Sequence, residues 1–352
     1  MNEKKLPFGL GLDYPAAIIF GAGASRGGLE DSRFPPPVDR DFFEIASQLE
    51  GRGTRELAKS VLSSVWELYV RIAGISLEEY YRDVETRSSI GKFAKTANQP
   101  KNWKRRQDEL EELIRRVYIH TAVDLKEDHP TPLKSEAHQL LLKQLKPNCT
   151  VITFNYDLLI EESFESADLW NPVDGYGLHV FGKSNDWCRR WLRDRGVTKP
   201  TESRIHLLKL HGSLGWTLYA NKSIRLKARP YSVRKGMVEP ISVLPPGWNK
   251  RIDRNPYKKF WREARLKLEK CKSLMILGYS LPETDLLARA LFAEVIRLRH
   301  DRKEYLRQLF LVDPSDEVKT RFVNLFNPAL GPFGKIFKFG SMLELKGKLQ
   351  GS

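Results

Sequence analysis

The chain has 352 residues, of which 41% are hydrophobic, enough for one large domain or two modest ones. Its net charge is +15, from 59 basic and 44 acidic residues. No stretch approaches the roughly 18 to 20 apolar residues that a membrane helix needs. The first residues, MNEKKLPFGLGLDYP, lack the apolar core of a signal peptide. We therefore expect a soluble, cytoplasmic protein without a membrane segment.

The three cysteines, Cys149, Cys188 and Cys271, are far apart in the sequence and form no CxxC pair. This spacing argues against a disulfide framework and against a structural zinc site built from four cysteines. We expect buried or incidental thiols and no metal site.

Basic residues cluster at Lys101–Arg106, Arg189–Arg195 and Lys222–Lys235. Such clusters are either ordinary solvated surface or contact sites for nucleic acid or an acidic partner. The sequence leaves both interpretations open.

The first strong element is the apolar run Ala16–Phe20, which predicts a buried strand. Apolar residues then recur at helical spacing from Asp39 to about Leu145, which predicts a helical insertion over about 40–147. The segments that carry this pattern are Asp39–Leu49, Leu57–Ile72, Leu77–Val84, Trp103–Val123 and Pro132–Leu145.

Strands and helices alternate through the rest of the chain. Irregular segments rich in proline or basic residues interrupt this pattern at about 166–204 and 217–253. Continuous apolar strands alternating with helices predict an α/β fold with a doubly wound parallel sheet. We expect one domain over 1–352. The predicted strands are Cys149–Phe154, Ile205–Leu210, Ser273–Leu277, Gln308–Val312 and an edge strand near Lys335–Phe339; the predicted helices are Leu158–Phe164, Tyr257–Cys271, Glu283–Arg299 and Pro314–Phe326.

A glycine-rich turn, Gly21-Ala22-Gly23-Ala24-Ser25, follows the first strand. The dinucleotide fingerprint G-x-G-x-x-G has glycine where this chain has Arg26, and no second strand supplies a nearby acidic residue. A hydride-transferring dehydrogenase is therefore disfavoured. The turn's backbone N–H groups suit a pyrophosphate at the start of a helix. A plain tight turn is the alternative.

The next strand ends in Thr153-Phe154-Asn155-Tyr156-Asp157. Ligands of open α/β sheets bind at such carboxyl ends, and Asn155 and Asp157 offer donors, acceptors and charge. The alternative is that Asn155 or Asp157 simply caps the helix that follows.

Among the seven histidines, His211 alone ends an apolar strand and is followed by glycine. Imidazole is a natural proton acceptor near neutral pH. This position makes His211 the candidate general base, against the alternative of a structural histidine.

Two later strand ends carry further candidates. Gly278 allows close approach of a ligand, and Ser280 follows it before the next helix. Asp313 ends another strand, where it suits either a ribose hydroxyl or a helix cap.

In this order and spacing, the glycine-rich turn and the motifs at the later strand ends resemble the SIR2-like family, in the branch found in bacterial defence proteins. Pro245-Pro246 followed by Trp248-Asn249-Lys250 is also similar to this branch. The resemblance covers residues 15–345. It implies an NAD⁺ site. The implied roles are phosphate binding by Gly21–Ser25, positioning of the nicotinamide ribose or a water by Asn155, general-base action by His211, pocket shaping by Asp157, closure over nicotinamide near Asp39, and contact with the adenosine half by Gly278, Ser280 and Asp313.

Protein-deacetylating sirtuins carry a zinc ribbon with four cysteines, which this chain lacks. The resemblance therefore implies an NAD⁺ hydrolase that acts in antiphage defence. The open alternatives are a protein deacylase or ADP-ribosyltransferase, and a non-catalytic NAD⁺ or ADP-ribose sensor. The branch also implies a homo-oligomer or a partner, such as a HerA-type ATPase or a short Argonaute. The chain has no P-loop motif of its own, so any ATPase activity would come from another chain.

Overall fold

We describe the protein from a computed structural model. The structure describes residues 10–49, 54–61, 76–90, 100–124, 131–177, 180–181, 185–218, 224–231, 242–244, 252 and 256–350. The predicted helix Leu57–Ile72 lies outside these ranges beyond residue 61, as does the Pro245–Lys250 block.

The centre of the molecule is a six-stranded sheet in which every neighbouring pair is parallel. Its inner strands are buried along their whole length because helices cover both faces, which explains their continuous apolar sequences. The strands, in spatial order, are β13 (Leu330–Phe339), β12 (Leu306–Val312), β11 (Ser273–Leu277), β1 (Ala16–Phe20), β4 (Cys149–Thr153) and β6 (His206–Lys209).

The chain fills the sheet outward from β1, first through β4 to β6 and then through β11 and β12 to β13. The direction of winding therefore reverses between β1 and β11. Ligands of doubly wound sheets bind outside the carboxyl ends of the strands at such a reversal. The predicted Rossmann-like, doubly wound parallel sheet is confirmed.

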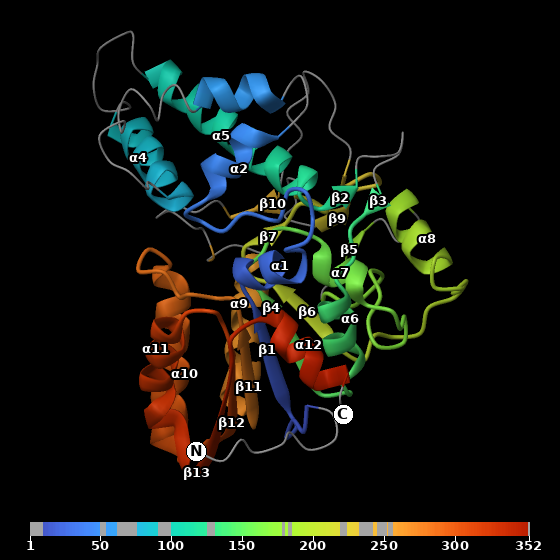
Figure 1. The fold of residues 1–352 in the computed structure, drawn as a ribbon, viewed down its shortest axis with the longest axis vertical. Coiled ribbons are helices and arrows are strands. Elements are labelled where there is room, and N and C mark those ends of the chain that lie inside the picture. Colours follow the sequence, from blue (N-terminus) through green and yellow to red (C-terminus); the bar gives the residue numbers. More distant parts are fainter. Residues whose placement is uncertain are drawn as a thin grey trace.

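Two helical layers cover the sheet (Figure 1). One face carries α9 (Tyr257–Lys270), α10 (Leu286–Arg302), α11 (Asp316–Phe326) and the short 3₁₀ helix Asn327–Ala329. The other face carries α1 (Ala22–Gly28), α6 (Glu136–Lys143), α7 (Leu159–Ser163) and α12 (Met342–Gln350).

The last predicted helix of the insertion is α6, which covers the sheet, and the preceding part of the insertion lies beyond the carboxyl ends of the strands (Figure 1). Its helices α2 (Phe42–Gln48), α4 (Leu77–Ile90) and α5 (Pro100–His120) build a hydrophobic core separate from that of the sheet. Tyr156 and Leu214, from the loops after β4 and β6, belong to this second core. The insertion therefore packs directly on the strand ends that carry the candidate site.

The predicted boundaries differ from the structure in several places. A two-stranded pair, β2 (Val123–Asp124) and β3 (Thr131–Pro132), interrupts the insertion where only helices were predicted. The segment 166–204, predicted to be irregular, contains α8 (Asp186–Arg193) and β5 (Val180–Phe181). The 217–253 region and the adjoining loop contain the short strands β7 (Gly212–Ser213), β8 (Trp216–Leu218), β9 (Ile224–Leu226) and β10 (Ser242–Val243).

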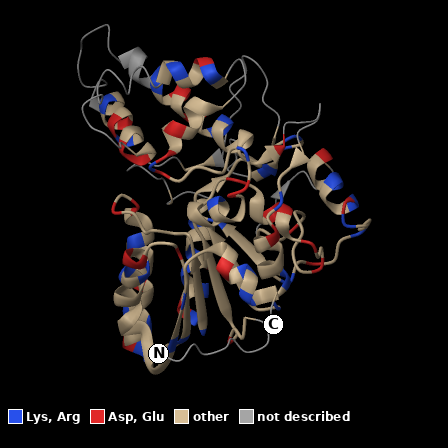
Figure 2. Cartoon of the chain, in the orientation of Figure 1, with Lys and Arg blue, Asp and Glu red and all other residues tan. Residues whose placement is uncertain are grey.

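Two of the basic clusters, Lys101–Arg106 on α5 and Arg189–Arg195 in and directly after α8, lie on segments that carry charges of both signs, whereas part of Lys222–Lys235 lies outside the described residues. Figure 2 shows Lys and Arg interspersed with Asp and Glu on α4, α5 and α8. On α8, Arg190 pairs with the buried Glu162 and with Asp194. Ion pairing within these segments thus uses part of the positive charge.

None of the helices described here is both long enough and apolar enough to cross a membrane.

Candidate active site

The glycine-rich turn after β1 packs against the turn after β11. Gly21 N donates to Leu277 O at 2.9 Å, and Gly23 N donates to Gly278 O at 2.9 Å. A Cβ on Gly278 would lie 2.0 Å from Ala24 N, and Gly278 has a φ of +55°. These glycines are therefore needed because two backbones meet at the point where the winding reverses.

Three predicted residues form one buried hydrogen-bonded chain at the ends of β1 and β4. The Asn155 amide donates to Gly21 O at 2.9 Å and to Ser25 Oγ at 3.0 Å. The Ser25 hydroxyl donates to Asp157 Oδ2 at 2.9 Å. Each of the three side chains is at most 7% exposed. The structure thus brings the carboxamide, the hydroxyl and the carboxylate to the glycine-rich turn.

Asp157 supports both the turn before α7, whose N-cap is Leu158, and the candidate site. Its Oδ1 accepts from Leu159 N at 3.0 Å, while Oδ2 accepts from Ser25. Thr153 has a supporting place, since its hydroxyl donates to Phe20 O and accepts from Asn155 N. Thr153 therefore joins β1 to β4 and holds the backbone of Asn155.

His211 lies at the end of β6 with its ring among aromatic side chains. The ring centroids of Phe154 and Tyr156, the two neighbours of Asn155 in the sequence, are 5.1 and 6.3 Å from that of His211. Trp261 of α9 lies 6.2 Å away. Because Phe154 and Tyr156 both contact the imidazole, His211 lies beside the Asn155 loop and is 7% exposed.

Asp39 lies at the junction between the insertion and the site. Its Oδ1 accepts from Glu78 N at 2.8 Å, at the start of α4. Burial raises the pKa of Asp39, against the opposing effect of this backbone hydrogen bond. Burial also raises the pKa of Tyr118 on α5, and the carboxylates of Asp157 and Asp39 add to that shift. Asp39 and Asp157 thus act in the same direction on the pKa of this phenol.

Two candidates on the other half of the sheet, Gly278 and Asp313, line a small void together with Lys319. The void is too small to hold a water molecule. Burial raises the pKa of Asp313, whose Oδ1 accepts from Ser315 N. Ser280 is exposed, and its carbonyl accepts from Arg321 on α11. Because the void admits no water molecule, it does not by itself provide a dinucleotide pocket.

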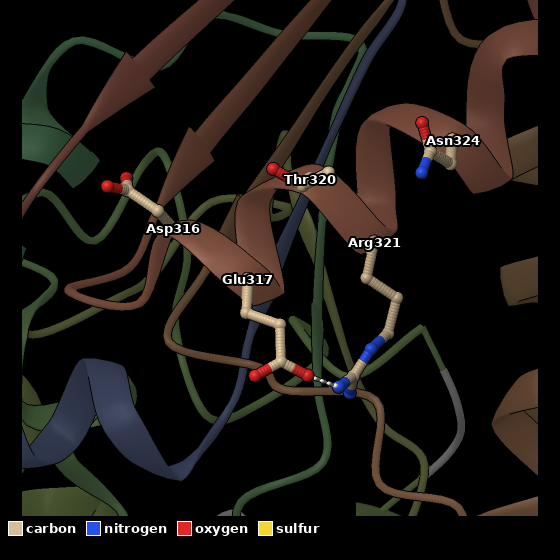
Figure 3. A pocket seen from close by; sticks show the side chains of 5 residues that line it. All are labelled: Asp316, Glu317, Thr320, Arg321 and Asn324. Carbon is tan, nitrogen blue, oxygen red and sulfur yellow. Dashed lines mark hydrogen bonds and ion pairs between the residues drawn. The ribbon is translucent and has the colours of Figure 1, made fainter.

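A shallow hollow on α11 lies apart from the predicted residues. Figure 3 shows Asp316, Glu317, Thr320, Arg321 and Asn324 around it, with Glu317 and Arg321 paired at 2.9 Å. None of the sequence-predicted residues lines it. Its composition resembles that of an ordinary charged helix surface.

Two functional candidates, Lys209 and Asp285, were missed by the sequence analysis. Lys209 Nζ, within the apolar strand β6, donates to the Asp157 carbonyl and pairs with Glu161 at 2.9 Å. Asp285 Oδ2 lies 3.7 Å from His211 Nε2. A charged residue inside an apolar strand was a visible signal for Lys209. Asp285 gave no such signal, because its place in the sequence is that of a helix N-cap, and it does cap α10.

In the part of the chain described here, no group of three or more His, Cys, Asp or Glu side chains is arranged to hold a metal ion. All three cysteines are buried and free.

A family model described as SIR2-like domain matches residues 149–327, just over half of the chain. None of the curated proteins compared with this chain matches it. Similar solved structures include a Sir2 homolog–NAD complex, which is 12% identical with a TM-score of 0.44; the match covers 96% of this chain and 88% of that one. A structure of Sir2 enzymes addressing mechanism and regulation is 14% identical with a TM-score of 0.39, covering 95% and 90%. A mutant Sir2 homologue with ADP-ribose is 15% identical with a TM-score of 0.39, covering 96% and 92%. These similarities are too low to carry an argument, and it is the extent of the family match that identifies the chain as a member of the SIR2-like domain family.

Proposed function

We propose that this protein hydrolyses NAD⁺ at the nicotinamide–ribose bond, giving nicotinamide and ADP-ribose. The observation that carries the proposal is the buried chain of Asn155, Ser25 and Asp157 at the glycine-rich turn, with the His211 imidazole beside it. Four types of polar group meet here at the edge of the sheet where this fold binds ligands. We propose that residues 1–352 act as one SIR2-like unit.

The side chains present suit a dinucleotide substrate. The Ser25 hydroxyl and the Asn155 amide supply neutral hydrogen-bonding groups, and Asp313, directly after β12, supplies an acceptor for a ribose hydroxyl. We propose less direct roles for Asp39, Thr153 and Ser280. We assign Asp39 to the edge nearest the insertion and Thr153 to support of Asn155.

The chemistry needs little acid catalysis, because the cationic nicotinamide is already a good leaving group. When the C1′–N bond breaks, its electron pair neutralises the pyridinium nitrogen. A water oxygen bonds to C1′, and one proton of that water passes to His211. Asn155 orients the ribose or the water, while Asp157 fixes Ser25. Proton transfer by a positioned side chain contributes about 10²- to 10⁴-fold to rate.

The test compares the NAD⁺ hydrolysis rates of purified wild type, His211→Ala and Asn155→Ala. We expect each substitution to lower kcat by at least about 10²-fold while circular dichroism and the melting temperature show a folded protein. His300→Ala is the matched control, since His300 is exposed on α10. Full activity in a folded His211→Ala or Asn155→Ala protein would overturn the assigned roles.

Assays on the same purified protein distinguish hydrolysis from the alternative functions. Transfer to an acyl-lysine peptide would yield O-acyl-ADP-ribose, and ADP-ribosylation would label a protein acceptor. Binding of NAD⁺ without turnover, measured by calorimetry with and without a partner, would indicate a sensor. Release of nicotinamide and free ADP-ribose in equal amounts supports the hydrolase.

The resemblance to defence proteins extends the proposal to antiphage defence in the cytoplasm by depletion of NAD⁺. We propose that activity depends on a homo-oligomer or on a partner such as a HerA-type ATPase, with nucleic acid reached through that partner or the basic clusters. Cells expressing wild type or His211→Ala, with and without phage, test this. NAD⁺ should fall after infection only with the wild type.

A further inference from the structure

The imidazole of His211 faces a buried carboxylate that comes from the other half of the sheet. Asp285 lies in the loop between β11 and α10, and its Oδ2 is 3.7 Å from His211 Nε2. This separation exceeds that of a hydrogen bond but lies within the range of an ion pair. The Asp285 residue is 3% exposed, so solvent screens the contact weakly.

Two further contacts fix the Asp285 carboxylate. The Tyr279 hydroxyl donates to Oδ2 at 2.7 Å, and Ala288 N donates to Oδ1 as the first turn of α10 begins. Burial raises the pKa of Tyr279, and the Asp285 carboxylate raises it further, so the phenol remains a neutral donor. The 17-residue helix α10 also directs its positive dipole end toward Asp285. These contacts stabilise a negative charge beside His211.

Aromatic side chains hold the His211 ring, the partner of Asp285, in place. The His211 ring makes an edge contact with Phe154, and its centroid lies 6.3 Å from that of Tyr156 and 6.2 Å from that of Trp261. The Trp261 indole N–H donates to Leu210 O at 3.1 Å, which holds the indole against the end of β6. With its ring enclosed, His211 has little freedom to turn away from Asp285.

We propose that Asp285 is a positioning residue that holds the His211 ring and stabilises the imidazolium formed when His211 takes a proton from water. This inference rests on the hydrolase proposed above. The proton that leaves the attacking water resides on His211, and the Asp285 carboxylate supplies the compensating charge without itself being protonated. Because we propose that Asp285 acts through His211, we expect it to affect kcat rather than NAD⁺ binding.

A capping role alone would give a different result, and Asp285→Asn separates the two. Asparagine caps helices as well as aspartate does and has the same shape, but it lacks the charge. We expect Asp285→Asn to lower kcat about 10- to 100-fold, as for other outer partners that orient a histidine, with KM changed less than about twofold. Asp285→Ser, which also preserves a cap, should behave like Asp285→Asn.

Asn185→Ala is the matched control. Asn185 caps α8 through Cys188 N at 2.9 Å, on a helix that carries none of the candidate residues. Its loss should lower stability by about 1 kcal/mol and leave kcat unchanged. Wild-type kcat in Asp285→Asn, or an equal fall in the control, would overturn the proposal.

A second readout does not depend on turnover. In protein labelled with ¹⁵N-histidine, the His211 ring signals are assigned by their loss in His211→Gln. These nitrogen shifts should move in Asp285→Asn and stay in place in Asn185→Ala. If the wild type proves inactive toward NAD⁺, the hydrolase proposal fails, while the shifts still decide whether Asp285 controls His211. Unchanged shifts would rule out that control.

Discussion

The two halves of the sheet edge form their parts of the candidate site in different ways. At β1, β4 and β6, side chains hydrogen bond to one another, as in the buried chain from Asn155 through Ser25 to Asp157. At β11 and β12, the backbone after β11 contacts the backbone after β1. The side chains there mostly hydrogen bond within their own turns, as Asp313 does with Ser315 N. Asp285 departs from this pattern, because it reaches from the second half to His211 in the first.

This difference predicts which kinds of substitution each half tolerates. A polar network fails when one partner is removed, because the buried groups left behind lose their hydrogen bonds. A backbone contact fails when a side chain is added, because close-packed main chains cannot separate without disturbing both turns. Removal of side chains therefore tests the first half, and addition of a methyl group tests the join between the halves.

The largest expected effect is that of Gly278→Ala. The new Cβ would lie 2.0 Å from Ala24 N, at a residue whose φ is already in the left-handed region. We expect a loss of about 3–5 kcal/mol in the free energy of unfolding, from strain and overpacking together. Urea denaturation measures it.

Gly347→Ala is the matched control for that substitution. Gly347 lies within α12, and a Cβ there would meet nothing within 4 Å. We expect a gain of about 0.5–1 kcal/mol, since alanine favours helix. Equal stability of the two variants would show that the turns after β1 and β11 are not in close contact.

The next largest expected effect is a loss of folding stability in acid, caused by His138 beside β1. His138 on α6 stacks on Phe20 at 5.3 Å, and burial lowers its pKa to about 4 from 6.5. The unfolded chain takes up a proton below pH 6.5 while the folded chain stays neutral, so stability falls as pH drops toward 4. Above pH 6.5 neither state is protonated and this contribution is constant. The loss over the window is about 3 kcal/mol.

Unfolding measured from pH 7 to pH 4 checks the acid prediction. His138→Gln should lose this part of the pH dependence, whereas His300→Gln, at an exposed site, should keep it. An unchanged pH profile in His138→Gln would assign the acid sensitivity to other groups.

The smallest effect is expected at Asp313. Asp313→Asn keeps an acceptor for Ser315 N but weakens the acceptor offered to a ribose hydroxyl. We expect KM for NAD⁺ to rise about 3- to 10-fold with kcat little changed, as for the loss of one charge-assisted hydrogen bond. Initial-rate kinetics measure it, with Asp301→Asn on α10 as an exposed control. A fall in kcat alone would place Asp313 outside substrate binding.

Much of this site was predictable because the ends of strands can be located from the sequence. Apolar runs locate β1, β4, β6 and β11, and the carboxyl ends of parallel strands share one edge. The placement of Asn155, Asp157 and His211 near the Gly21–Ser25 turn follows from that rule. The boundaries were less predictable, as with β2 and β3, because a two-residue strand has no periodicity to detect.

The sequence by itself determined the strands, the helical insertion and the residue types gathered at one sheet edge, because local periodicity and strand direction are encoded in neighbouring residues. Only the tertiary structure decided that Gly278 packs on Ala24, that Lys209 supports Asp157, and that Asp285 faces His211. Those contacts join segments far apart in the chain. The pairing of such segments depends on how the whole sheet winds and packs, and no local pattern records it.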